Sequence, residues 1–160
     1  MTTRKPKEKA MKIEKLAHRN VTSCTVHDNL DRAAQLMWER DVGCLPVIDD
    51  QGHVAGMITD RDVCMAAYTQ GAPLQSIPVT TAMAKRVFSC TADDDVAEVE
   101  RTMREQQIRR MPVIDDRGHA IGIVSINDLA RAAAIGSVPP DEVATTLAAV
   151  TAPRASVAVS

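Results

Sequence analysis

The sequence predicts a mixed α/β (α+β) fold made of two β-α-β-β-α repeats, and three observations lead to this prediction. Residues 45–62, L-P-V-I-D-D-Q-G-H-V-A-G-M-I-T-D-R-D, recur without a gap at residues 111–128 as M-P-V-I-D-D-R-G-H-A-I-G-I-V-S-I-N-D. Around both stretches, helical and strand-like spacings of apolar residues follow one another in the same order. Each copy alone would have about 60 residues, which is marginal for an independent core. The chain is therefore interpreted as a tandem duplication in which the copies share one core.

The first copy is predicted to contain a strand, a helix, a two-stranded hairpin and a second helix. Asn29 is a suitable N-cap, and apolar residues follow it at helical spacing. Gly56, which has no side chain, allows a bulge or a close backbone approach. The expected boundaries are a helical turn at 13–17, a strand at 23–26, a helix at 30–40 ended by Gly43, strands at 45–48 and 53–59, and a helix at 60–70.

The second copy repeats this order after a linker rich in proline and glycine. Asp95 occupies the position of Asn29, and Glu98 is placed to complete a capping box with it. Pro140 suits the first turn of a last helix. The expected elements are a short helix at 79–84, a strand at 87–91, a helix at 96–107, strands at 111–114 and 119–125, and helices at 126–135 and 141–150. The predicted domains are a disordered basic arm at 1–11, repeat 1 at 12–70, a linker at 71–86, repeat 2 at 87–136, and a C-terminal tail with a short helix at 137–160.

Composition excludes several classes of function. The formal net charge of −2 argues against nucleic acid as the main partner. The sequence has no run of about 18 apolar residues, so no membrane span is expected. The basic N-terminus is not followed by an apolar stretch, so it is not read as a secretory signal. The four cysteines form no CxxC pair, which predicts reduced thiols and a cytoplasmic location.

The repeated motif identifies a family resemblance. The repeat order, the P-V-I-D-D-x-G-x-x-x-G hairpin and the endings G-M-I-T-D-R-D and G-I-V-S-I-N-D are similar to those of cystathionine-beta-synthase (CBS) domain pairs. The resemblance covers about residues 12–136 and is specific, because several motif positions match twice at one spacing. It implies two repeats packed about a pseudo-twofold axis. It also implies two clefts that bind adenosine-containing ligands, such as AMP, ADP, ATP, S-adenosylmethionine or NAD-type molecules, and assembly into a homodimer.

The family's ligand motif falls where a strand ends and a helix begins, at Thr59 to Asp62 and at Ser125 to Asp128. A helix N-terminus has free N–H groups suited to a phosphate, and the Thr59 or Ser125 hydroxyl can add a hydrogen bond. Asp62 and Asp128 are assigned to ribose hydroxyls, because a carboxylate accepts from a diol but repels phosphate. The alternative is that T-x-x-D and S-x-x-D are ordinary capping boxes. Both interpretations can hold at once.

The arginines near the two motifs are not equivalent. Arg61 lies inside the first motif, where the second has Asn127, and Arg109 and Arg110 precede Pro112, where the first copy has Gly43 and Cys44. We expect these arginines to bind phosphate, because a guanidinium donates in pairs. Ordinary surface charge is the alternative for Arg109 and Arg110.

The adenine is expected to lie against the strand that carries Pro46 or Pro112, next to the chain at Cys24 or Cys90. Backbone groups there can read the edge of the base, and apolar side chains can enclose the ring. The alternative for these strands is a plain structural core.

His53 and His119 are interpreted as solvent-exposed turn residues, and no spacing resembles a zinc site. There is no nucleophile elbow or Walker loop, so no enzyme, metal or covalent cofactor is predicted. The predicted function is that of a regulatory sensor that binds an adenine nucleotide and acts, as a homodimer, on an unknown regulated protein. The alternatives are a platform for dimerisation or partner binding with empty clefts and, less favoured, a cysteine-based redox sensor.

Overall fold

A computed structural model describes residues 10–153. Residues 1–9 of the predicted arm and residues 154–160 of the predicted C-terminal tail lie outside the described residues. The described chain forms two compact units. One contains residues 18–89 and 112–123, and the other contains residues 10–17, 90–111 and 124–153. The division therefore does not follow the repeats, because the hairpin of repeat 2 is split between the units. None of the described helices is both long and apolar enough to cross a membrane.

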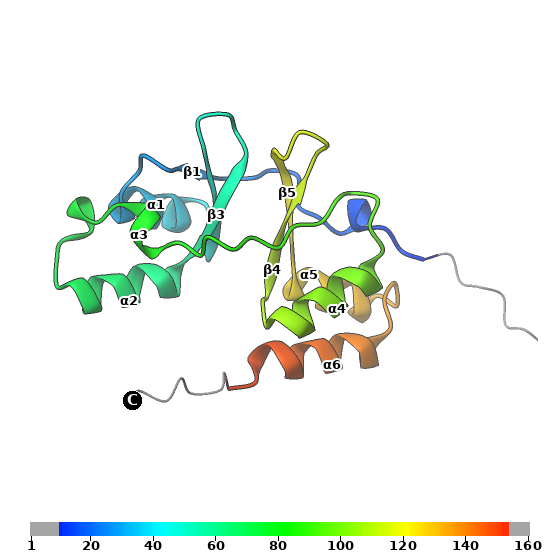
Figure 1. The fold of residues 1–160 in the computed structure, drawn as a ribbon. Coiled ribbons are helices and arrows are strands. Elements are labelled where there is room, and N and C mark those ends of the chain that lie inside the picture. The colour runs from blue at the N-terminus through cyan, green and yellow to red at the C-terminus, as the bar shows by residue number, and fades with distance from the viewer. Residues whose placement is uncertain (1–9, 154–160) are drawn as a thin grey trace, which may run out of the picture. The chain divides into compact units, whose positions relative to one another are not determined.

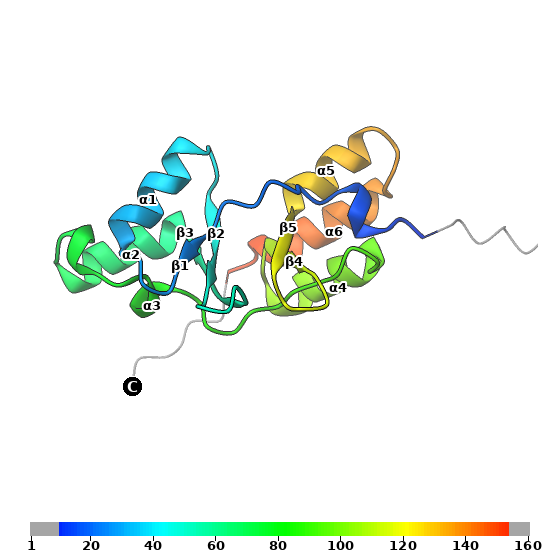
Figure 2. The same cartoon turned by 90° about the horizontal axis from the view of Figure 1, so that it is seen from above.

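The first unit contains a three-stranded sheet and two helices (Figure 1). β1 (Cys24–Thr25) pairs in parallel with β2 (Cys44–Ile48), which pairs antiparallel with β3 (Val54–Thr59). Helices α1 (Leu30–Glu39) and α2 (Asp60–Gln70) lie on one side of this sheet (Figure 2). The buried side chains of this unit are mostly aliphatic, and the fully buried ones include Leu30, Leu45, Val47 and Ile58.

Helix α1 begins as predicted and ends earlier than predicted. The Asn29 side chain accepts a hydrogen bond from the Arg32 N–H at 2.9 Å, which satisfies one of the free donors of the first turn. The prediction that Gly43 ends the helix is wrong. The chain leaves the helical path at Asp41, which has φ 51°, and the Val42 N–H then donates to the Met37 carbonyl. Aspartate tolerates this left-handed conformation better than most residues, so it can end a helix as glycine does.

Gly56 lies beside a bulge and makes a close backbone approach, the two alternatives that were predicted for it. The register of β2 and β3 shifts between Val47, which pairs with Gly56, and Ile48, which pairs with Val54. A Cβ atom at Gly56 would lie 2.6 Å from Met83 Sδ and 3.0 Å from the Ala84 carbonyl oxygen. The approach is held by two backbone hydrogen bonds between Met57 and Ala84, of 3.0 and 2.8 Å. The linker that makes this contact includes the 3-10 turn η2 (Leu74–Ser76) and α3 (Val79–Ala82).

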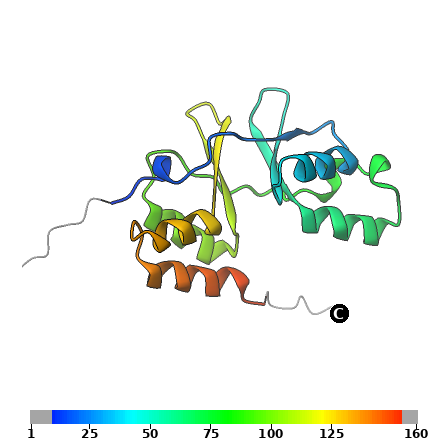
Figure 3. The same ribbon diagram turned by 180° about the vertical axis from the view of Figure 1, so that it is seen from behind.

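The second unit contains three helices that pack together (Figure 3). They are α4 (Val96–Gln106), α5 (Ile126–Ala134) and α6 (Pro140–Thr151), preceded by the 3-10 turn η1 (Ile13–Lys15). Helix α6 contacts both α4 and α5, and it buries Val143, Thr146 and Val150. Arg104 Nη1 donates to Thr146 Oγ1 at 2.9 Å, and Gln107 Nε2 donates to the Ala149 carbonyl at 3.3 Å. The repeat-2 hairpin is β4 (Arg110–Ile114) with β5 (Ala120–Ser125).

Two predictions for repeat 2 are wrong. Residues 87–91, all of them described, form no strand, and only Cys90 takes part in an isolated bridge. Asp95 makes no side-chain cap, and Glu98 therefore completes no capping box. The Asp95 carboxylate instead accepts from Lys12 Nζ at 2.6 Å. A hydrogen bond from a charged donor is stronger than one from a backbone N–H, so the ion pair takes the carboxylate from the helix.

Candidate ligand-binding site

The β3–α2 junction holds the first predicted motif. Thr59 is the N-cap of α2, and its Oγ1 accepts from the Asp62 N–H at 3.2 Å. Asp62 Oδ2 in turn accepts from the Thr59 N–H at 2.9 Å and from Thr59 Oγ1 at 2.8 Å. The capping box that was given as the alternative is therefore present at Thr59 and Asp62. It uses only one oxygen of the Asp62 carboxylate, because no described residue donates to Oδ1.

The first N–H groups of α2 are already hydrogen-bonded within the protein, whereas those of an uncapped helix N-terminus would be free to bind a ligand. The Asp60 N–H donates to the Gly43 carbonyl at 3.2 Å, and the Arg61 N–H donates to Asp60 Oδ1 at 2.8 Å. With the Asp62 N–H held by Thr59, each N–H of the first three residues has an acceptor. A phosphate here would have to displace Asp60 and approach two carboxylates.

The β5–α5 junction holds the second motif with the same cap. Asp128 Oδ2 accepts from the Ser125 N–H at 2.7 Å and from Ser125 Oγ at 2.6 Å. The Asp128 side chain is nevertheless different from that of Asp62, because Arg131 Nη2 donates to its other oxygen, Oδ1. Asp128 is also more buried, at 5% exposed. Its second oxygen is thus occupied by the protein itself.

Two residues that the motif did not single out account for this asymmetry. Arg131 has Met65 as its equivalent in repeat 1, and a thioether cannot hold a carboxylate. Asp60 has Ile126 as its equivalent, which offers no side-chain acceptor to the following N–H. The spacing of three residues between Asp128 and Arg131 on a helix was the available signal for the ion pair.

The predicted base-binding residues lie in the strands. Cys24 Sγ donates to the Pro46 carbonyl at 3.9 Å, so these two predicted residues are brought together in repeat 1. Pro112 and Cys90 are buried in repeat 2. Burial raises the pKa of the Cys24 thiol to about 11 and that of the Cys90 thiol to about 12, with a further contribution from a neighbouring aspartate in each case. Both thiols are therefore protonated at neutral pH, which does not favour redox sensing.

The three predicted arginines have different surroundings. Arg61 is exposed on the first turn of α2. Arg109 is exposed, and its carbonyl accepts from the Ile126 N–H at 2.9 Å, which places its backbone beside the start of α5. Arg110 is half-buried at the first position of β4. Around α5, three basic residues (Arg109, Arg110 and Arg131) therefore accompany one acidic residue, whereas the equivalent positions around α2 carry two acidic residues and one basic residue.

His53 and His119 are not simply turn residues facing solvent. Their rings stack with centroids 5.7 Å apart and an interplanar angle of 20°. His119 Nε2 also donates to the Gln51 carbonyl at 3.1 Å, and the His119 and Arg117 N–H groups lower the pKa of Asp115. Within residues 10–153, no group of three or more histidine, cysteine, aspartate or glutamate side chains is arranged to hold a metal ion.

Comparison with known proteins assigns the family. The model of the CBS domain matches the chain twice, at residues 13–68 and 77–135. The chain belongs to the CBS domain family. The predicted resemblance and the two-repeat fold are thereby confirmed, with the exception of the missing first strand in repeat 2.

Two known proteins are similar to this chain in sequence over about two thirds of its length. The chain is 34% identical over 110 residues to the CBS domain-containing protein YhcV of Bacillus subtilis. This alignment covers 69% of this chain and 76% of the relative. It is 33% identical over 111 residues to hypoxic response protein 1 of Mycobacterium tuberculosis. This alignment covers 69% of this chain and 77% of the relative.

Solved structures of CBS domain pairs have the same fold. Hypoxic response protein I, crystallised with two coordinated zinc ions, has a TM-score of 0.68 and 30% identity, covering 76% of this chain and 98% of that one. The CBS domain pair of protein MJ0100, in complex with 5′-methylthioadenosine and S-adenosyl-L-methionine, has a TM-score of 0.69. At 23% identity, with 79% of this chain and 98% of that one covered, this second likeness concerns the fold.

Proposed function

We propose that this CBS domain protein is a regulatory module that binds an adenosine-containing ligand at the β3–α2 junction and, as a homodimer in the cytoplasm, acts on a partner protein. The observation that carries the proposal is the Asp62 carboxylate. It is half-buried, it is fixed through Oδ2 by Thr59, and its Oδ1 accepts from no described residue. A carboxylate oxygen held in this way is a suitable acceptor for a ribose hydroxyl.

The charges around the junction narrow the class of ligand. Asp60 and Asp62 both lie in the first turn of α2, and the Asp60 carboxylate already accepts the hydrogen bond of the Arg61 N–H. We expect an adenosine compound with a neutral or cationic 5′ group, such as S-adenosylmethionine, to bind there more tightly than AMP, ADP or ATP. At the β5–α5 junction, the excess of arginine favours a phosphate, whereas Arg131 competes with a ribose for Asp128.

The experiment is thermal unfolding of the full chain with adenosine, 5′-methylthioadenosine, S-adenosylmethionine, NAD, AMP, ADP and ATP. A ligand present at about 100 times its dissociation constant stabilises the folded state by roughly 2.7 kcal/mol. The Asp62→Asn variant tests the site, because its amide oxygen can replace Oδ2 in the cap while its amide nitrogen replaces the ribose acceptor. We expect its affinity for the best ligand to fall about 10- to 100-fold, the range for a hydrogen bond to a charged group.

The controls separate the two junctions. Asp128→Asn makes the same change at the β5–α5 junction, and Asp50→Asn makes it on an exposed hairpin turn, where the carboxylate contacts only His27 among the described residues. Asp50→Asn is expected to bind as the wild type does. Unchanged melting temperatures across the whole ligand panel would contradict the proposal and favour the alternative of an unliganded platform.

A further inference from the structure

Glu100 is a buried acid in the contact between helices α4 and α6. Its side chain is 3% exposed, and its one hydrogen-bond contact among the described residues joins Oε1 to Thr146 Oγ1 of α6, at 3.4 Å. Buried carboxylates are usually paired with a cation or accept several hydrogen bonds, because an ionised oxygen loses its hydration on burial. The single long contact of Glu100 therefore calls for a physical explanation.

The Thr146 hydroxyl has one hydrogen and two possible acceptors for it. Its Oγ1 lies 2.9 Å from the Glu142 carbonyl oxygen and 3.4 Å from Glu100 Oε1. Arg104 Nη1 donates to the same Oγ1 at 2.9 Å. When the hydrogen points to the nearer carbonyl, an ionised Glu100 receives no hydrogen bond, whereas a protonated Glu100 can donate to Oγ1 itself. The arrangement therefore matches the neutral form of Glu100.

The charges around Glu100 leave it partly uncompensated. Among the described residues, the charged groups that act on it are Arg104 of its own helix and Glu142 of α6, and none belongs to α5. Arg104 Nη1 also lies 3.6 Å from Glu142 Oε2, so one guanidinium faces two carboxylates. Burial is the largest effect and raises the pKa of the Glu100 carboxyl above its ordinary value of 4.5, although Arg104 and Thr146 oppose this. The docked helix therefore holds a proton on Glu100.

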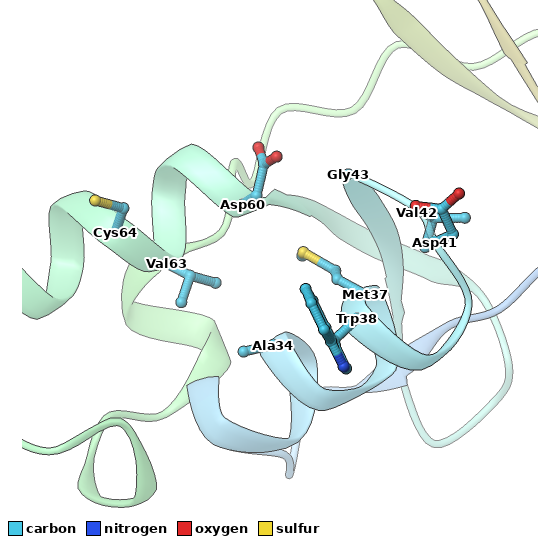
Figure 4. A pocket seen from close by; sticks show the side chains of 9 residues that line it. All are labelled: Ala34, Met37, Trp38, Asp41, Val42, Gly43, Asp60, Val63 and Cys64. Carbon is cyan, nitrogen blue, oxygen red and sulfur yellow. The ribbon is translucent and has the colours of Figure 1, made fainter.

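Repeat 1 shows that the helix pair itself does not require this acid. Ala34 of α1 stands at the position of Glu100, and it lines an open groove of about 460 Å³ between α1 and α2 (Figure 4). In repeat 2, α6 packs on the helix pair and buries Val143, Thr146 and Val150. The acid thus occurs where a further helix covers the pair, and its single hydrogen-bond contact is with that helix.

The other polar contacts between α4 and α6 are weak ones. Gln107 Nε2 donates to the Ala149 carbonyl at 3.3 Å, which is long for such a bond. The Glu142 side chain that faces Arg104 is 59% exposed, and ion pairs open to solvent contribute little to stability. The attachment of α6 therefore depends on its buried side chains and on the state of the acid beneath them.

We propose that α6 is a releasable cover on the face formed by α4 and α5, and that protonation of Glu100 controls its release. With Glu100 neutral, α6 docks through its buried valines and the Thr146 hydrogen bonds. Ionisation places a poorly solvated negative charge in the contact, and undocking returns that carboxylate to water. A rise in pH therefore favours release of α6. The effector is a proton, so this inference goes beyond the proposed ligand site and does not depend on it.

Amide hydrogen exchange of the full chain without nucleotide tests the proposal. The opening equilibrium of α6 is obtained from the protection factors of its amides, which correct for the intrinsic effect of pH on exchange. We expect this equilibrium constant to be independent of pH below about pH 4.5 and to rise up to about tenfold per pH unit above it. It should level off once Glu100 is ionised in the docked form as well. Protection of α4 is expected to persist.

Three variants assign the effect to Glu100. Glu100→Gln keeps the shape and the donor of the neutral acid but cannot ionise, so its α6 is expected to be equally protected at every pH. Glu105→Gln changes an exposed residue of the same helix and is the matched control, which should keep the wild-type trend. Glu142→Gln removes the second carboxylate near Thr146 and is expected to keep the direction of the trend.

The wild-type profile can overturn the inference without any variant. Protection of α6 that does not change with pH would do so. Loss of protection in α4 and α5 at the same pH as in α6 would do so too, because it would show unfolding of the whole unit and not release of one helix. A pH trend that survives in Glu100→Gln would assign the effect to another group. Because no nucleotide is present, none of these results bears on ligand binding at the β3–α2 junction.

Discussion

Arg131 donates to the carboxylate of Asp128 and so occupies the oxygen that is unoccupied in its repeat-1 equivalent, Asp62. The two copies thus share a cap and a motif but differ in the group that a ligand would meet. The difference at this carboxylate oxygen arises from one pair of equivalent residues, Met65 and Arg131, and the pair Asp60 and Ile126 adds a second difference between the junctions.

Placing an arginine at position 65, as at the equivalent position 131, is predicted to give the β3–α2 junction the occupied carboxylate of the β5–α5 junction. Met65→Arg places a guanidinium three residues after Asp62, where it can hold the second carboxylate oxygen. Ligand affinity at the β3–α2 junction is expected to fall about 10-fold or more, which titration calorimetry would measure. Gln70→Arg adds the same charge at the exposed end of α2, away from Asp62, and serves as the control. Equal affinities in the two variants would contradict the assigned role of Asp62.

The two capping aspartates are predicted to differ in their contribution to stability. Asp128 is buried and bound by Ser125 and Arg131, whereas Asp62 is half-buried and bound by Thr59 alone among the described residues. Replacing Asp62 by alanine is expected to cost about 1 kcal/mol, as loss of a helix cap does. Replacing Asp128 is expected to cost about 2–3 kcal/mol, because a buried charge-assisted bond is lost as well. Urea unfolding of both variants without ligand checks the order, which an equal loss would refute.

Glu100 is predicted to make the stability of the protein depend on pH. Its side chain is 3% exposed, and burial raises its pKa above the ordinary value of 4.5, although the Arg104 charge opposes this. The folded state therefore holds the proton more tightly than the unfolded state does. Its contribution to stability is fully present below about pH 4.5 and is lost as the pH rises through the folded pKa.

The Glu100→Gln variant removes this titration. Its free energy of unfolding, relative to the wild type, is expected to increase as the pH rises from 4 to 8, in urea unfolding at several pH values. Glu105→Gln, an exposed residue of the same helix, is expected to show no such trend. A Glu100→Gln difference that is constant with pH would show that Glu100 has the same pKa in both states.

Gly56→Ala is predicted to destabilise the protein by about 1–3 kcal/mol, the usual range for overpacking. The new methyl group would meet both the flexible Met83 side chain and the Ala84 carbonyl oxygen. A second substitution, Met83→Ala, should restore only part of the loss, because the backbone contact persists. The comparison is Gly71→Ala, where nothing lies within 4 Å and only the φ of 58° resists the change, at about 1 kcal/mol. Thermal unfolding that shows full rescue would mean that the side chain alone determines the cost.

The sequence by itself determined the duplication, the family, the order of most elements and both capping motifs. These features depend on spacing along the chain: Asn29 before an apolar stripe, or Thr59 three residues before Asp62, forms its hydrogen bond through local geometry. Arg131, three residues after Asp128, was within reach of the same reasoning.

Only the tertiary structure decided the features that depend on residues far apart in sequence. The Asp95 carboxylate binds Lys12, 83 residues away in sequence, and does not cap α4. The predicted strand at 87–91 does not form. Glu100 and Arg104 resemble ordinary residues of α4 in the sequence, and only the structure shows that Thr146 of α6 contacts both of them. The physical reason is competition: a side chain with two possible partners takes the stronger one, and a distant partner reaches it only once the chain has folded.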